Sequence, residues 1–337
     1  MLAPHIKKNV DKLWNLFWTA GITNPLVAVE QITYLLFLKR LEGIDNVRAK
    51  NGHPSIYTGT IKIGEREIEA DQCRWSYIEQ DKTPKHLIDT VFPWLRDLEK
   101  HFTASQASTN DIEAIGGRMS DAYFQLDPNK AAILQLAIDL INKLFARVDA
   151  QSAATDIMGD TFEYLLSEIA TAGKNGQFRT PRHIIRCMVE MLDPQPGEHI
   201  IDPAAGTGGF LFSSLSHILA QHTDPELLRI EWDGTPHRNY GDQFTPEEFS
   251  AVHKGDYYVG FDNDRTMVRI GWMNMILHGI ENPQIHQRDS LGKRRDDDPP
   301  HKSFGLRELR RGTGQSTFHR YGGCCRPGRG DLSQSGA

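Results

Sequence analysis

The segment from Glu198 to Ala220 constrains the fold of this 337-residue chain more than any other. It joins a short apolar strand that ends at Asp202, a glycine-rich turn, and a helix expected at Phe210 to Ala220. The elements expected after it are a strand at Tyr257 to Asp262, a helix at Arg265 to His278 that Asp264 caps, and a strand at Gln284 to His286. This alternation of strands and helices predicts an α/β fold with a parallel sheet.

The glycine-rich turn predicts a ligand site, because glycines let backbone N–H groups approach a ligand and a helix N-terminus favours negative charge. Its sequence, Gly206-Thr207-Gly208-Gly209, differs from the G-x-G-x-x-G of dinucleotide sites. Such sites also place an acid about 20 residues further on, whereas Asp262, the next strand-end acid, comes far later. A nicotinamide site would therefore need residues 222–255, a polar and irregular stretch, to be an inserted loop. A purely structural turn is the other alternative.

Residues 1 to about 150 are expected to be mostly helical. Asn24 can cap a helix that begins at Pro25, with Lys39 and Arg40 favouring its C-terminal end. A second long helix is expected at Lys130 to Val148. Because no chemistry-bearing motif occurs in this region, a packing or protein-interaction domain is favoured.

Shorter elements complete the expected organisation. Ile61 to Ile63 is a candidate hairpin strand, and Thr155 to Ala170 a helix with one apolar face. A glycine-bearing loop follows at Gly173 to Gly176, and a helix opens at Thr180 and Pro181.

Charge, apolar runs and cysteine content limit the partners and the cell compartment to be expected. The net charge is −6, whereas a protein that holds DNA by itself is more often basic, so a partner would supply much of any grip on DNA. The sequence has no run of about 18 apolar residues that could span a membrane, and no signal peptide is expected. The four cysteines form neither a disulfide nor a zinc pattern, which favours free thiols in the cytoplasm and no metal site.

Five segments together resemble the modification (M) subunits of type I restriction–modification systems. They are Gly176 to Arg182, Asp202 to Phe210, Gly260 to Asp262, Met273 to Ile280, and Asp289 to Leu291. The sequence departs from the family at Arg179, where an aromatic residue is commoner, and at Asp262, where glutamate is commoner. The resemblance implies a helical N-terminal domain at residues 1–150. It implies an incomplete class I, Rossmann-like S-adenosylmethionine-dependent methyltransferase core at 151–302.

The resemblance also implies roles for single residues. Asp262 would accept hydrogen bonds from the ribose hydroxyls of the cofactor, Thr207 to Gly209 would approach its amino-acid end, and Asp289 would lie beside its adenine. Plainer alternatives are a helix cap for Asp262, a loop acid for Asp289, core packing for Phe178, and a solvated helix residue for Arg182. The full set of expected cofactor-binding residues is Gln177, Phe178, Arg179, Thr180, Pro181, Arg182, Asp202, Gly206, Thr207, Gly208, Gly209, Asp262 and Asp289.

The family resemblance implies site-specific methylation of adenine N6 in DNA, and it alone favours adenine over cytosine N4. It implies as partners DNA, a specificity (S) subunit, a second modification subunit and a restriction (R) subunit. Two alternatives stay open: a non-catalytic module that binds the cofactor or other subunits, and an NAD-dependent oxidoreductase.

No catalytic residue is assigned, because the Asn-Pro-Pro-aromatic loop that would hold the flipped adenine is absent from the sequence. Asn282 and Pro283 precede the third strand, and Asp298 to His301 follows a charged run that cannot be a buried strand. Residues 303–337 are rich in Arg and Gly and lack Val and Ile. They are expected to be an aberrant, disordered tail without strands, as after truncation or a frameshift, and the chain is expected to transfer no methyl group.

Overall fold

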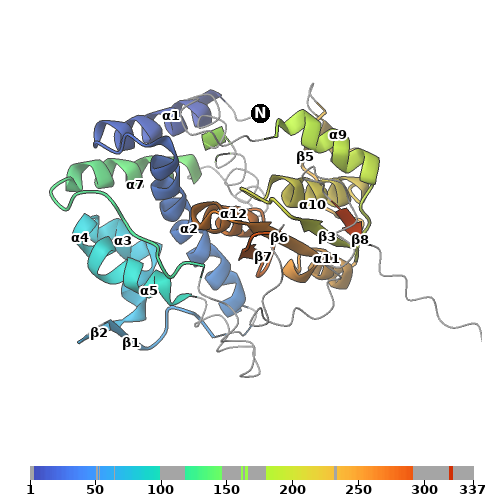
Figure 1. Ribbon diagram of the computed structural model, residues 1–337. Helices are drawn as coiled ribbons and strands as arrows, with labels where there is room; N and C mark the ends of the chain where they lie inside the picture. Colours follow the sequence, from blue (N-terminus) through green and yellow to red (C-terminus); the bar gives the residue numbers. More distant parts are fainter. Residues whose placement is uncertain are drawn as a thin grey trace, which may run out of the picture.

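The computed structural model describes residues 4–50, 52, 54–63, 65–98, 118–145, 161, 164–165, 180–230, 234–290 and 319–321. Within these residues a helical N-terminal region packs beside a region built on a four-stranded sheet, as expected (Figure 1). The loop at Gly173 to Gly176, the candidates Gln177 to Arg179, and most of the expected helix Thr155 to Ala170 lie outside the described residues.

The described part of the N-terminal region contains three long helices: α1 (Pro4–Thr19), α2 (Pro25–Lys50) and α7 (Ala131–Phe145). The prediction for the start of α2 is confirmed, because Asn24 Oδ1 accepts a hydrogen bond from the Leu26 N–H at 3.0 Å. Its predicted end is wrong, since the helix continues well past Arg40. Arg40 and Leu41 are buried there, so tertiary packing outweighs the preference of cations for a helix end.

Shorter elements fill the space beside α2. The expected strand at Ile61 to Ile63 is found as β1, which pairs antiparallel with β2. The bounds of these elements are β1 (Thr60–Ile63), β2 (Arg66–Glu69), η1 (Ala70–Cys73), α3 (Trp75–Asp81), α4 (Pro84–His86), η2 (Leu87–Val91) and α5 (Phe92–Arg96). None of the helices in the described part of the chain combines the length and the apolarity of a membrane span.

The sheet has the strand order β7-β6-β3-β8. Its three expected strands, β3 (His199–Asp202), β6 (Tyr258–Asp262) and β7 (Gln284–Gln287), run parallel, which confirms the predicted alternation. The helix α10 (Gly209–Gln221) connects β3 to β6, and α12 (Arg265–Leu277) connects β6 to β7. The helix α9 (Arg182–Leu192) packs on α10.

Two parts of the sheet region differ from the sequence analysis. Residues 222–255, expected to be irregular, contain β4 (Arg229–Ile230), β5 (Pro236–His237) and α11 (Pro246–Val252), followed by the single turn η3 (Gly255–Tyr257). The tail at 303–337, expected to form no strand, contributes β8 (His319–Tyr321), which pairs antiparallel with β3. The tail lacks Val and Ile, but β8 contains Tyr321, a residue type that is common in strands, and strand pairing itself uses backbone groups.

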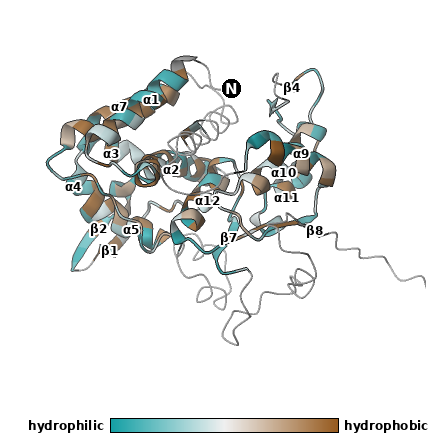
Figure 2. Cartoon of the chain, turned by 45° about the horizontal axis from the view of Figure 1, so that its top comes forward, coloured by the Kyte–Doolittle hydropathy of each residue, from teal (hydrophilic) through white to brown (hydrophobic). Residues whose placement is uncertain are grey.

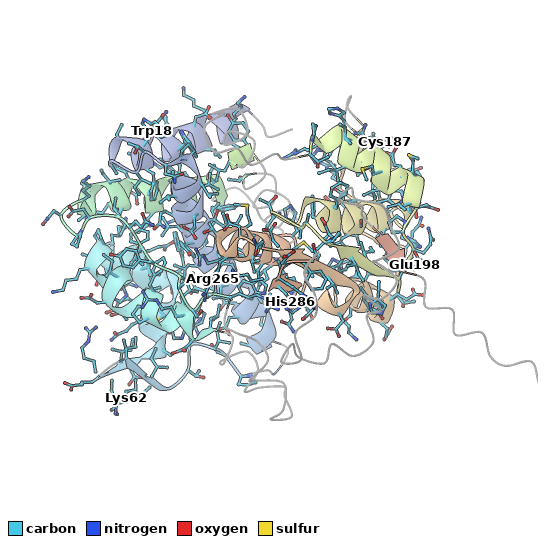
Figure 3. All side chains as sticks on the ribbon, in the orientation of Figure 1. Trp18, Lys62, Cys187, Glu198, Arg265 and His286 are labelled. Carbon is cyan, nitrogen blue, oxygen red and sulfur yellow. The ribbon has the colours of Figure 1, made fainter. Side chains whose placement is uncertain are left out.

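The helix α12 lies between the N-terminal region and the sheet, in contact with α2, β6 and β7 (Figures 1 and 2). Every residue from Met267 to Leu277 is buried. Its contacts with α2 include the rings of Phe37 and Trp272, whose centroids are 5.6 Å apart, and an ion pair between Arg269 and Glu30. Figure 3 labels Arg265, the first residue of α12, whose guanidinium contacts Asp121 of the N-terminal region at 2.9 Å. The two regions therefore share one core.

Candidate functional site

The glycine-rich turn lies at the edge of the sheet where β3 and β6 end. The register pairs Asp202 of β3 with Gly260 of β6, so the two parallel strands end side by side. The Ala205 N–H donates to the Phe261 carbonyl at 2.8 Å, and the Gly206 N–H donates to Asp262 Oδ2 at 2.9 Å. The turn is thereby joined to the end of the neighbouring strand, which is where open α/β sheets bind ligands.

The turn requires glycine at two of its positions, and a glycine of α12 packs closely against it. Gly206 and Gly208 have φ angles of +52° and +78°, which favour glycine. An added Cβ at Gly271 of α12 would lie 2.8 Å from the Gly206 carbonyl oxygen. The helix α10 begins immediately after Gly208, without a side-chain cap. The N-terminus of a helix that opens on a glycine turn favours a ligand with negative charge.

Asp262 connects the turn to the strand edge through both of its carboxylate oxygens. Oδ2 accepts from Gly206, and Oδ1 accepts from the Asp264 N–H at 2.8 Å. Each oxygen keeps lone-pair capacity for a further donor. The helix cap, which was the alternative role for Asp262, is instead Asp264, whose Oδ1 accepts from the Thr266 N–H at 2.8 Å. The prediction that Asp264 caps the following helix is therefore confirmed.

Asp202 is a buried acid at the same edge. Its carboxyl Oδ1 accepts from the Ala204 N–H at 3.0 Å, while Oδ2 is buried and has no hydrogen-bond partner among the described residues. Burial, and secondarily the nearby charge of Asp262, raises the pKa of Asp202 to about 6, against the opposing effect of the Ala204 N–H. The site therefore has one carboxylate tied into backbone contacts and one acid held partly protonated near neutral pH.

The other predicted residues that the structure describes lie around this edge. The Arg288 N–H donates to the Asp262 carbonyl at 2.8 Å. The exposed Asp289, which follows Arg288 after the end of β7, is thereby held near Asp262. The helix expected to open at Thr180 and Pro181 begins at Arg182, which is exposed, and Pro181 is its N-cap without a side-chain hydrogen bond.

The start of α9 reaches the turn through one apolar contact. An added Cβ at Gly209 would meet Ile185 Cδ1 at 3.3 Å, so the first turns of α9 and α10 touch. Within the described residues, Asp202, Asp262, Asp289, the turn and the start of α9 are thus gathered in one place.

Sequence reasoning missed two residues of α12 that support the turn. Gly271 approaches Gly206, and the Asn274 Nδ2 donates to the Thr207 carbonyl at 2.7 Å. The available signal was a glycine and an asparagine inside the otherwise apolar run from Ile270 to Leu277, residue types that are unfavourable in a helix interior without a specific contact. The described residues contain no group of three His, Cys, Asp or Glu side chains placed to hold a metal ion.

Replacing Asp202 with asparagine should stabilise the protein at neutral pH and leave stability unchanged near pH 4. The folded carboxyl has a pKa of about 6, above the ordinary value of 3.8, so the folded state holds a proton that the unfolded state has released. The stability that this group contributes is full below pH 4 and is lost as the pH rises through 6. Urea unfolding of both proteins between pH 4 and 7 measures the difference, and a gain that does not change with pH would contradict this assignment.

Two family models match the chain in consecutive segments. Residues 6–141 match the HsdM N-terminal domain, and residues 153–304 match the N-6 DNA Methylase family. These two matches define the class of protein as a DNA methylase core preceded by a helical domain. The chain belongs to the family of methylase, or modification, subunits of type I restriction enzymes. The predicted family and fold class are confirmed.

Individual relatives give the extent of the match. The chain is 29% identical over 292 residues to the EcoEI methylase subunit of Escherichia coli, which covers 81% of this chain and 49% of that subunit. It is 35% identical over 113 residues to the HindI methylase subunit of Haemophilus influenzae, covering 33% of this chain and 23% of the relative. The chain thus spans about half the length of the EcoEI subunit.

Solved structures share the fold. A modification subunit of a type I restriction enzyme from Vibrio vulnificus YJ016 superimposes with a TM-score of 0.56 at 20% identity, over 83% of this chain and 55% of that one. A chain from a type I restriction–modification complex gives a TM-score of 0.56 at 21% identity, over 83% and 50% of the two chains.

Proposed function

We propose that this chain binds S-adenosylmethionine at the turn Gly206 to Gly209 and serves as the cofactor-binding part of an adenine-N6 DNA methyltransferase subunit. The observation that carries the proposal is the hydrogen bond from the Gly206 N–H to Asp262 Oδ2, at 2.9 Å. It joins the glycine turn that opens α10 to the carboxylate at the end of β6. A ligand with a nucleoside part and a charged tail requires both. Membership of the family with an N-6 DNA Methylase core supports the same ligand.

The residues present fit an adenosyl sulfonium. Asp262 has lone pairs left for the two ribose hydroxyls, since each of its oxygens accepts one backbone N–H. The buried Oδ2 of Asp202 lacks a partner in the described part of the chain and can accept from an ammonium group. Asp289, which follows the end of β7, would accept from the amino group of the adenine. Thr180 to Arg182, at the start of α9, would contact the ligand, and Gln177 to Arg179 stay expected contacts on the family resemblance alone.

When bound, S-adenosylmethionine would supply an electrophilic methyl group. The chain's own task in this proposal is to hold that group at the sheet edge and keep it oriented. Transfer to adenine also needs acceptors for the protons of the exocyclic amine. The 337 residues contain no Asn-Pro-Pro-aromatic loop to provide them, so we assign no catalytic residue and expect binding without transfer from these residues alone.

The partners we propose are those of the family: DNA, a specificity subunit that reads the sequence, a second modification subunit and a restriction subunit, all in the cytoplasm. The net charge of −6 supports delegated DNA recognition, since an acidic protein gains little from phosphate contacts of its own.

Calorimetric titration of the full chain with S-adenosylhomocysteine tests the proposal. We expect saturable binding at one site, whereas NADH should give no heat beyond dilution. A folded sample that binds NADH and not S-adenosylhomocysteine would establish the oxidoreductase alternative instead. A folded sample that binds neither would remove the proposed ligand altogether.

A further inference from the structure

The side chain of Asn274 is buried completely in the middle of α12, directly beneath the glycine-rich turn. Its Nδ2 donates to the Thr207 carbonyl at 2.7 Å. Its Oδ1 is buried and has no hydrogen-bond partner in the part of the chain that the structure describes. The orientation of the amide is fixed by its neighbour, because the reverse orientation would place two oxygens 2.7 Å apart.

An asparagine at this position is unfavourable for folding alone. Its neighbours along α12, Met273 and Met275, are fully buried and apolar, and the unpartnered Oδ1 costs free energy in such surroundings. A leucine of similar size would avoid that cost and suit the helix better. The advantage of asparagine at this position therefore lies in the one bond that it makes to the turn.

One face of α12 presents three positions to the turn. Gly271 lies against the Gly206 carbonyl, Asn274 binds the Thr207 carbonyl, and an added Cβ at Gly208 would lie 3.2 Å from Met275 Sδ. Positions 271, 274 and 275 share a helix face because they are three and four residues apart. Of the three contacts, the bond from Asn274 is the only hydrogen bond. Together with the bond from the Gly208 N–H to the Ala205 carbonyl, at 2.7 Å, it fixes the direction in which the Thr207–Gly208 peptide points.

We propose that Asn274 is a positioning residue for the cofactor. By holding the Thr207 carbonyl toward α12, it fixes the Thr207–Gly208 peptide, whose N–H donates to the Ala205 carbonyl at 2.7 Å, and so sets the shape of the turn that the ligand would contact. The inference rests on the proposed function, since it assumes that the turn binds S-adenosylmethionine. It extends the site from the residues that touch the ligand to a buried residue of the helix that also packs against the N-terminal region.

The test compares Asn274→Leu with wild type in the full chain, using calorimetric titration with S-adenosylhomocysteine and urea unfolding on the same samples. We expect affinity to fall about tenfold, the value of one hydrogen bond, while the unfolding midpoint is unchanged or higher. The matched control is Asn239→Leu. Asn239 Nδ2 donates to the Ser216 carbonyl at 3.1 Å, on the far half of α10, and its loss should leave affinity unchanged.

A second variant covers the case in which Asn274→Leu does not fold. Asn274→Asp keeps the size of the side chain, and it can donate to the Thr207 carbonyl only while the carboxyl is protonated. Its affinity relative to wild type should therefore fall as the pH rises, a change that a merely structural role would not produce.

The outcomes separate the two proposals. Wild-type affinity in the leucine variant, or an aspartate variant whose relative affinity is independent of pH, would overturn the positioning role and leave the proposed function standing. Absence of S-adenosylhomocysteine binding by the folded wild-type chain would overturn both.

Discussion

Replacing Arg269 with alanine is expected to lower the free energy of unfolding by about 3–5 kcal/mol, the cost of breaking a buried ion pair by removing one partner. The side chains of Arg269 and Glu30 are each 7% exposed. Glu30 Oε1 accepts from Arg269 Nε at 2.8 Å and also from Nη2, while Nη1 binds Asp121. Without the guanidinium, the buried Glu30 carboxylate keeps the Tyr34 hydroxyl, at 3.2 Å, and loses its counter-charge.

The control for this experiment lies one turn earlier on the same helix. Arg265 also pairs with Asp121, but the two side chains are 47% and 41% exposed, so Arg265→Ala should cost less than about 1 kcal/mol. Urea unfolding measures both variants. Equal losses of unfolding free energy in the two variants would show that the burial of Arg269 is unimportant, and would contradict the prediction. The double change of Arg269 and Glu30 to methionine should be closer to wild type than Arg269→Ala, since it leaves no unpaired buried charge.

The second large effect concerns ligand binding. Asp262→Ala should weaken S-adenosylhomocysteine by about 100-fold, because the change removes the acceptor for the ribose hydroxyls and the anchor of the Gly206 N–H together. The matched control is Asp256→Ala, an exposed acid before the start of β6, at the opposite end of that strand. Its affinity should equal that of wild type.

Calorimetry on samples shown by circular dichroism to be folded gives both affinities. If Asp262→Ala binds as tightly as the control, Asp262 does not contact the ligand, and the binding site that we propose at the ends of β3 and β6 is wrong. A loss in both variants would point to a change in overall stability and would equally contradict a specific role for Asp262.

The parts of the fold that local sequence determines could be predicted. The cap at Asp264 and the cap at Asn24 depend on residues two positions away, and both were found where expected. Two of the three parallel strands, β3 and β6, follow from short apolar runs that end in acids. The clustering of Asp202 and Asp262 followed from the same pattern, because parallel strands place their carboxyl ends at one edge.

The features that were missed depend on contacts across the chain, with one exception. The continuation of α2 beyond Arg40 follows from burial against other elements, and β8 depends on the backbone edge of β3. The contacts of Gly271 and Asn274 with the turn require α12 to cross beneath it, which no local pattern encodes. The exception is α11, whose capping box at Thr245 and Glu248 is legible in the sequence but lies within a polar stretch that resembles a loop.

The most direct test of the central claim is a crystal structure of the chain grown with S-adenosylhomocysteine. The account predicts that the ligand lies against Gly206 to Gly209, with both ribose hydroxyls within hydrogen-bonding distance of the Asp262 carboxylate. A ligand bound elsewhere on the protein, with this edge of the sheet unoccupied, would contradict it.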